Sequence, residues 1–232
     1  MNNNIKDKVD FDEYAAQYEQ LLKNQLNFFN EDRGYFSKYK IDLVKKECNK
    51  NLIKPKKILE FGCGIGLNIP YIEKAFPDSK IYVSDISNKS LEYVNKKYKN
   101  IKILNDKDIE KYKYDFIFIS GVFHHIHPKL RNEVIKRLFF ILKPKGSLFV
   151  FEHNPYNPVT RHMVNTCPFD EDAVLIKMKD MKSNFLKTSA FKVKSSGYCL
   201  YFPERFKFMN GLENILKYIP LGGQYYVYFQ PS

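Results

Sequence analysis

The stretch ILEFGCGIG, Ile58–Gly66, decides the fold. Its first residues are apolar, β-branched or aromatic, which is typical of a buried strand, and the glycines Gly62, Gly64 and Gly66 follow. Glycines at such a turn let a ligand approach the backbone without hindrance from Cβ atoms. A dinucleotide fingerprint, G-x-G-x-x-G, would need glycine where this chain has Leu67. The stretch therefore predicts a strand, a ligand-binding turn and a helix, and it disfavours NAD.

Strand-like and helical runs alternate after this stretch. The predicted strands are 56–61, 80–85, 101–104, 114–120 and 147–152, and the predicted helices between them lie near 67–76, 88–97 and 128–142. Such interleaving argues for a parallel sheet covered by helices on both faces. We therefore predict a doubly wound, Rossmann-like α/β fold.

The flanking regions have other patterns. Residues 10–25 and 31–50 carry apolar residues at three- and four-residue steps, which predicts two amphipathic helices. Residues 169–187 predict a further helix, and 191–202 and 224–229 predict two late strands. Because no long crossover separates these strands, we expect them to form an antiparallel pair that completes the sheet.

The length of 232 residues and the hydrophobic share of 44% suit one domain with a large core. We expect a helical cap in 1–50, a cofactor-binding core in 51–152, and an acceptor-side insertion with the final strands in 153–232. The sequence shows no secretory signal and no run near the ~20 apolar residues that span a bilayer, so we expect a cytoplasmic protein without membrane insertion. The scattered cysteines form no C-x-x-C pair and are expected to be reduced. The sequence leaves the oligomeric state open.

The formal net charge of +12 favours an anionic partner. A solvated, lysine-rich surface explains the same charge without any partner.

Three acids lie at or just after the ends of successive predicted strands. Glu60 lies just before the glycines, and a buried carboxylate is costly unless it has a partner or a role. Asp85 ends the next strand, where such folds place a carboxylate that accepts hydrogen bonds from ribose hydroxyls. It can alternatively cap the following helix, although Ser87 is also able to do so. Asp106 follows the third strand and is either a neighbour of an adenine ring or a simple turn residue.

Taken together, these segments resemble the motifs of class I S-adenosylmethionine-dependent methyltransferases. The resemblance rests on ILEFGCGIG, VSDIS (83–87), YDFIFISGVFHHI (114–126) and LKPKGSLFVFE (142–152). It implies a seven-stranded sheet with an antiparallel last strand, S-adenosyl-L-methionine as cofactor and S-adenosyl-L-homocysteine as product. The cofactor contacts that it implies are Tyr14, Tyr18, Glu60, Gly62, Cys63, Gly64, Gly66, Asp85, Ile86, Asp106, Lys107, Ser120 and Gly121. For the two tyrosines, ordinary helix packing is the alternative.

All five histidines fall at or after the carboxyl ends of the fourth and fifth predicted strands, where doubly wound sheets bind ligands; they are His124, His125, His127, His153 and His162. A hydroxyl acceptor must lose its proton as it is methylated, and histidine is the natural general base. The candidates are His125, His124 and His153, with Glu152 as the acid that orients the imidazole. In relatives of this type one histidine of the HHI run can be purely structural. The run HHIH lacks the usual spacing of zinc ligands and has no cysteine beside it, so we expect no metal.

Residues 152–176 and the tail from Phe202 resemble bacterial methyltransferases of sugar and surface-polysaccharide pathways. Candidate substrate contacts are Tyr156, Arg161 and Tyr201. The planar fork of Arg161 suits an anionic group, and a surface ion pair with Asp170 or Glu171 is the alternative. The aromatic rings can stack on a sugar or fill the core.

We therefore expect methyl transfer to a hydroxyl of an anionic small molecule: a sugar, a nucleotide-sugar or a surface-glycan precursor. A quinone or lipid-precursor methyltransferase shares the same core motifs and stays an alternative. RNA methylation fits the charge, but the segment after the fourth strand reads SGVFHH and lacks the NPPY or DPPY motif of many enzymes that methylate nucleic-acid amines. A catalytically silent cofactor-binding subunit is the alternative outside enzymes.

Overall fold

The computed structural model describes residue 12 and residues 33–232, and the statements below concern that part of the chain. Apart from Asp12, the predicted helix over 10–25, including Tyr14 and Tyr18, lies outside the described residues.

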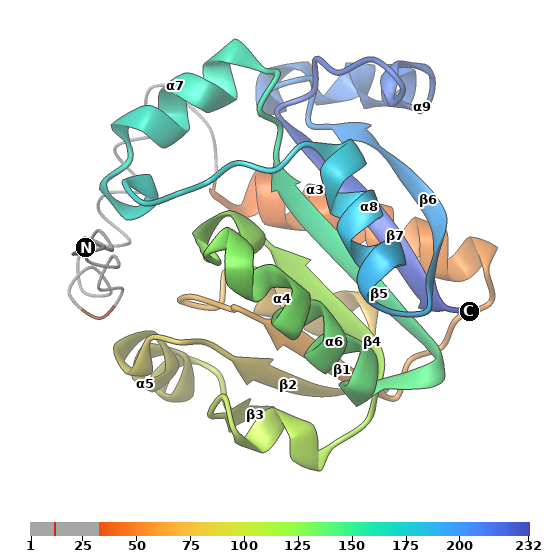
Figure 1. The fold of residues 1–232 in the computed structure, drawn as a ribbon. Helices are drawn as coiled ribbons and strands as arrows, with labels where there is room; N and C mark the ends of the chain where they lie inside the picture. Colours follow the sequence, from red (N-terminus) through yellow and green to blue (C-terminus); the bar gives the residue numbers. More distant parts are fainter. Residues whose placement is uncertain (1–11, 13–32) are drawn as a thin grey trace.

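The centre of the molecule is a seven-stranded sheet with the order β3-β2-β1-β4-β5-β7-β6 (Figure 1). The strands are β1 (Lys57–Phe61), β2 (Lys80–Ser84), β3 (Ile101–Leu104), β4 (Tyr114–Ser120), β5 (Leu142–His153), β6 (Phe191–Cys199) and β7 (Gln224–Pro231). Strands β1 to β5 pair in parallel, whereas β7 runs antiparallel to both β5 and β6. The predicted doubly wound fold is confirmed, including the antiparallel pair at its end.

Helices cover both faces of the sheet. One face packs on α3 (Arg33–Lys50), α4 (Ile69–Ala75) and α5 (Asn88–Lys97), and the other on α6 (Arg131–Ile141) and α8 (Met178–Thr188). In Figure 1, α3 lies behind the sheet and α8 in front of it. Residues 116–119 of the central strand β4 are fully buried, as expected for a parallel strand covered on both faces.

The shorter elements lie mainly between these layers and at the edges of the sheet. They are α7 (Pro158–Thr166), α9 (Glu213–Leu216) and the 3-10 helices η1 (Asp108–Lys111), η2 (Phe123–His125), η3 (Pro128–Leu130), η4 (Pro168–Asp170) and η5 (Glu204–Leu212). Figure 1 shows α7 beyond the carboxyl end of β5. Among the described helices, none combines the length and the apolar character needed to cross a bilayer.

Several predicted boundaries are wrong: the strand predicted over 147–152 begins at Leu142, and two elements nearer the C-terminus also differ. The helix predicted over 169–187 begins only at Met178, because the segment before it makes its backbone hydrogen bonds elsewhere. The Val174 N–H donates to the His124 carbonyl, and Arg131 donates to the Val174 carbonyl. The strand predicted over 191–202 ends at Cys199, since the next residue has a positive φ of 58°.

Candidate active site

The glycine loop after β1 combines tight packing with free space. Gly62, Gly64 and Gly66 have φ values of 74°, 51° and 78°, in the left-handed region that favours glycine. A Cβ atom on Gly62 would lie 2.4 Å from Val122, and one on Gly66 would lie 2.6 Å from Ile69. A Cβ atom on Gly64 would meet no atom within 4 Å. The outer two glycines therefore serve packing, while Gly64 presents bare backbone at the surface of the loop.

Asp85 lies directly against this loop. Its Oδ2 accepts a hydrogen bond of 2.7 Å from the Gly64 N–H, and its Oδ1 accepts one of 2.9 Å from the Ser87 N–H. Ser87 caps α5 by accepting from the Ser90 N–H, so the helix does not need Asp85 as its cap. Ile86 is 65% exposed, and its contact with the cofactor stays a prediction. Burial raises the pKa of Asp85.

Several buried polar atoms around the loop lack partners within the described region. Glu60 is buried, and its Oε1 accepts a 2.8 Å hydrogen bond from Asn68, but its Oε2 has no hydrogen-bond partner. The same holds for Asn68 Oδ1 and Ser84 Oγ. Burial raises the pKa of Glu60 to about 7, against the opposing effects of Asn68 and Lys40. Unsatisfied buried polar atoms are rare in native proteins, so three beside one loop indicate a polar ligand, and S-adenosylmethionine fits that description.

Lys40 is a site residue that the sequence analysis missed. It lies on α3, is buried, and donates a 2.7 Å hydrogen bond to the Ser120 hydroxyl at the end of β4. Burial lowers its pKa to about 8, although the nearby Glu60 opposes this shift. Because α3 contains several lysines, the sequence alone does not single out Lys40. The spacing of the buried Ile41 and Val44 was the available signal, because it places Lys40 on the buried side of the helix.

The other predicted cofactor contacts are spread around the same edge of the sheet. Cys63 is buried in the loop, and Gly121 follows β4 with a φ of 69°. Asp106 is 65% exposed and forms a 2.6 Å ion pair with Arg137 of α6, and Lys107 beside it is exposed. The ion pair gives Asp106 a structural role, and its contact with an adenine ring stays a prediction.

Near the loop, η2 is built around the buried carboxylate of Glu152. Oε1 of Glu152 accepts hydrogen bonds from the backbone N–H groups of Val122 (2.9 Å) and Phe123 (2.7 Å). Its Oε2 lies 2.6 Å from His124 Nδ1. The structure thus brings Glu152 together with a histidine, and that histidine is His124.

His124 is enclosed between two carboxylates. Its Nε2 lies 3.4 Å from Asp170 Oδ1, opposite the contact with Glu152. Burial favours the neutral ring, but Glu152 and Asp170 outweigh this effect and raise the pKa of His124 to about 10. At neutral pH both ring nitrogens of His124 carry protons, so it cannot accept another.

The imidazoles of His125 and His153 have lowered pKa values, in contrast to that of His124. His125 Nε2 lies 3.3 Å from Asp170 Oδ1, and its Nδ1 lies 3.6 Å from Asp172 Oδ1. The ring of His153 lies 5.0 Å from that of His124, centroid to centroid. Burial and the charge of His124 lower the pKa of both His125 and His153 to about 4. Both are therefore neutral near pH 7.

The remaining histidines lie outside this cluster. His127 is exposed and caps η3 by accepting from the Lys129 N–H, and His162 is exposed on α7. Neither residue contributes to the grouping of His124, His125 and Asp170, whose nitrogen and oxygen ligand atoms lie within 4.8 Å of one another. The spacing argument against a metal could not include Asp170, because this residue is distant in the sequence.

Two predicted substrate contacts, Tyr156 and Arg161, lie in the segment that joins β5 to η4. Tyr156 is 50% exposed, with the Lys177 ammonium 5.8 Å from its ring centroid. Arg161 is exposed on α7. The alternative of an ion pair with Asp170 is wrong, since within the described chain that carboxylate pairs with the histidines instead.

Tyr201 has a different environment. Its hydroxyl donates to the backbone carbonyls of Leu216 and Ile219, and its N–H donates to Glu213. These contacts hold the segment around α9 in place. The ring is half-buried and packs against the core, so a substrate contact by Tyr201 stays a prediction.

Comparisons with known proteins find methyltransferases that resemble part of this chain. Residues 59–148 match the family model described as "Methyltransferase domain". A malonyl-[acyl-carrier protein] O-methyltransferase of Ilyobacter polytropus is 30% identical over 158 residues, covering 62% of this chain and 60% of that protein. An uncharacterized protein of Rickettsia prowazekii is 27% identical over 107 residues, 42% of this chain and 43% of that protein. The chain thus spans less than two thirds of these relatives.

Solved structures share the fold. A plantazolicin methyltransferase in complex with S-adenosylhomocysteine superposes with a TM-score of 0.63 at 16% identity, covering 96% of this chain and 94% of that one. Magnesium protoporphyrin IX methyltransferase from Synechocystis with bound S-adenosylmethionine gives 0.63 at 17% identity, with both chains fully covered. The fold is that of class I S-adenosylmethionine-dependent methyltransferases. Residues 59–148 match a methyltransferase domain, and the two solved structures that share the fold contain S-adenosylhomocysteine and S-adenosylmethionine, respectively.

Proposed function

We propose that this protein transfers a methyl group from S-adenosylmethionine to a hydroxyl of an anionic small molecule, such as a sugar, a nucleotide-sugar or a surface-glycan precursor. The observation that carries the proposal is the pair of neutral imidazoles, His125 and His153, at the edge of the sheet that also holds the glycine loop. The two parts of the site touch, since Val122 just before the histidines packs against Gly62.

On the cofactor side, the role of the chain is to bind and orient S-adenosylmethionine. Gly64 offers bare backbone, Asp85 offers a carboxylate for ribose hydroxyls, and Glu60 offers a buried oxygen without a partner among the described residues. The bound sulfonium supplies an electrophilic methyl group with a good leaving group, so the protein needs mainly to position the acceptor in line with it.

On the acceptor side, the chain must take up the hydroxyl proton. His124 is already protonated between its carboxylates, so its role is to hold η2 and Asp170 together. His125 and His153 are neutral near pH 7, and a neutral imidazole has one nitrogen that can accept the proton. The exposed Arg161 and Lys177, which precede and follow Asp170 in the sequence, carry positive charge that suits an anionic acceptor.

A carboxylate acceptor is a second candidate. The relative from Ilyobacter polytropus, which gives the longer of the two matches reported above, is named as an O-methyltransferase of malonyl-[acyl-carrier protein]. A carboxylate has no proton to lose, so its methylation would not need His125 or His153. The two acceptor classes therefore predict different behaviour of the histidine variants.

The test supplies methyl-labelled S-adenosylmethionine together with sugar nucleotides, acyl-carrier-linked carboxylates, quinone precursors or RNA. We expect label in a sugar nucleotide, and a rate reduced about 100-fold or more by His125→Ala or His153→Ala with cofactor affinity unchanged. Label in a carboxylate at undiminished rate in both variants would support the second candidate instead. Label in RNA or a quinone would overturn the acceptor class, and cofactor binding without any transfer would indicate a silent subunit.

A further inference from the structure

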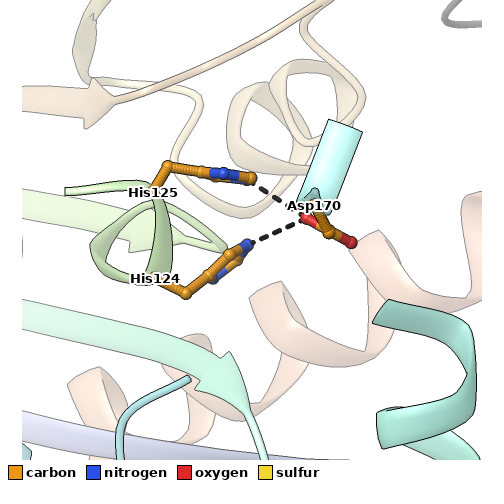
Figure 2. Close-up of side chains that lie close together, drawn as sticks. All are labelled: His124, His125 and Asp170. Carbon is orange, nitrogen blue, oxygen red and sulfur yellow. Dashed lines mark ion pairs between the residues drawn. The ribbon is translucent and has the colours of Figure 1, made fainter. Parts of the chain in front are cut away.

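The grouping of His124, His125 and Asp170 has the geometry of a metal site. His124 Nε2 and His125 Nε2 lie 3.4 Å and 3.3 Å from Asp170 Oδ1. These separations are longer than the 2.9 to 3.0 Å typical of an N–H···O hydrogen bond. Around a tetrahedral zinc ion with bonds of about 2.0 to 2.1 Å, neighbouring ligand atoms lie roughly 3.3 to 3.4 Å apart. Figure 2 shows both imidazoles directed at the same carboxylate.

Both histidines also have an acid at the other ring nitrogen. Glu152 Oε2 lies 2.6 Å from His124 Nδ1, which fixes the ring and directs Nε2 toward Asp170. Asp172 Oδ1 lies 3.6 Å from His125 Nδ1. A carboxylate behind a ligating histidine is the usual outer partner in protein metal sites, because it sets the tautomer and makes the imidazole a stronger donor.

The supporting backbone holds the three ligands before any ion binds. Glu152 is itself fixed by two backbone N–H groups of the Val122–Phe123 segment. The loop after Asp170 is tied to η2 by the hydrogen bond of 2.8 Å from the Val174 N–H to the His124 carbonyl. The side chains of His125 and Asp170 are 16% and 12% exposed, so an ion can reach an otherwise enclosed site.

We propose that His124 Nε2, His125 Nε2 and Asp170 Oδ1 bind one divalent first-row transition-metal ion, with zinc the best geometric match. The ion displaces the proton that His124 Nε2 carries in the metal-free protein, and this proton is released to solvent. Two imidazoles and one carboxylate suit zinc and its neighbours and do not suit magnesium or calcium, which prefer oxygen ligands. Three protein ligands leave a position for a water molecule or an acceptor oxygen. With His125 occupied as a ligand, His153 is the imidazole that remains beside the acceptor. The metal site does not depend on the proposed function.

Metal binding is measured on the full chain after removal of metals with a chelator. Calorimetric titration with zinc chloride, and with magnesium chloride as a comparison, gives affinity and stoichiometry without cofactor or acceptor. We expect one zinc ion per chain, no comparable magnesium binding, and at least a tenfold loss of zinc affinity in Asp170→Asn and in His125→Ala. His162→Ala is the matched control, because this exposed histidine lies on α7, and it should bind as the unmodified chain does.

Cobalt adds a readout of geometry, since a tetrahedral site gives intense visible absorption that the two ligand variants should lose. Circular dichroism of the metal-free variants checks their fold, and His125→Ala carries the test if Asp170→Asn does not fold. Equal zinc affinity in the unmodified chain, Asp170→Asn and His125→Ala would overturn the proposal. So would the absence of zinc binding by the unmodified chain. Neither result would affect the labelling experiment for methyl transfer, so the two proposals can fail separately.

Discussion

Glu60 and Lys40 place opposite charges in the interior beside the glycine loop. Both side chains are buried, and burial moves their pKa values toward each other, to about 7 for Glu60 and about 8 for Lys40. Burying such groups without full hydrogen bonding lowers stability. Residues of this kind are typical of sites that gain their partners from a ligand.

The substitution Glu60→Gln tests the cost of this carboxylate. The pKa of Glu60 is raised from 4.5 to about 7, so between these pH values the folded protein holds a proton that the unfolded chain has lost. The contribution of Glu60 to stability therefore falls as the pH rises through this window, by up to about 3 kcal/mol. Urea unfolding at pH 5, 6, 7 and 8 should show the variant gaining stability relative to the unmodified chain as pH increases. A constant difference between the two proteins would contradict the burial argument.

The glycine loop gives a matched pair of substitutions. Gly64→Ala places a methyl group where no atom lies within 4 Å, so it should cost only about 1 kcal/mol of backbone strain while reducing affinity for S-adenosylhomocysteine at least tenfold. Gly62→Ala drives the same group to 2.4 Å from Val122 and should lower the free energy of unfolding by a further 1 to 3 kcal/mol or so. Denaturant unfolding and calorimetry separate the two effects. Unchanged affinity in Gly64→Ala would remove the loop from the cofactor site.

At the scale of elements, the end of β5 organises η2 through one carboxylate. Glu152 accepts hydrogen bonds from two backbone N–H groups at η2 and forms an ion pair with the buried His124. Removing one partner of a buried ion pair leaves the other without compensation, which is strongly destabilising. The strand end thus fixes the loop on which the candidate catalytic residues lie.

Glu152→Gln should therefore lower the free energy of unfolding by about 2 to 4 kcal/mol. Glu110→Gln is the control, since it removes a carboxylate that is 48% exposed and pairs with Arg137, and it should cost less than about 1 kcal/mol. Guanidinium unfolding of both variants at pH 7 provides the comparison. Equal losses of unfolding free energy in the two variants would show that the buried Glu152–His124 pair stabilises the fold no more than an exposed pair does.

The sequence predicted most strands closely because their signals are local. Residues 101–104 and 114–120 are strands with the predicted bounds, since each is a compact apolar run between turns. Residues 171–177 were misassigned because tertiary hydrogen bonds to η2 replaced helical ones. Lys40 and Asp170 escaped detection for a related reason: their importance depends on neighbours that are distant in sequence. The spacing of Ile41 and Val44 indicates that Lys40 is buried but does not mark it as a site residue, and no local pattern marks Asp170.

At the scale of the whole molecule, the candidate site draws on segments that only the fold brings together. The glycine loop follows β1, Lys40 comes from α3, and Asp170 lies beyond β5. A ligand that contacts such separate segments stabilises the folded state alone, because the unfolded chain cannot assemble the site. Cofactor binding should therefore be visible in global unfolding.

We expect S-adenosylhomocysteine at about 100 times its dissociation constant to stabilise the chain by about 2.7 kcal/mol. For a protein of 232 residues, this corresponds to a rise in melting temperature of roughly 5 to 10 °C. Differential scanning calorimetry over a range of ligand concentrations should show the rise growing with the logarithm of concentration. The Gly64→Ala variant is the control and should show about half this rise or less at the same concentrations, because a loss of affinity of tenfold or more leaves at most about 1.4 kcal/mol. If both proteins gained the same stability, the ligand would be binding elsewhere than at the glycine loop.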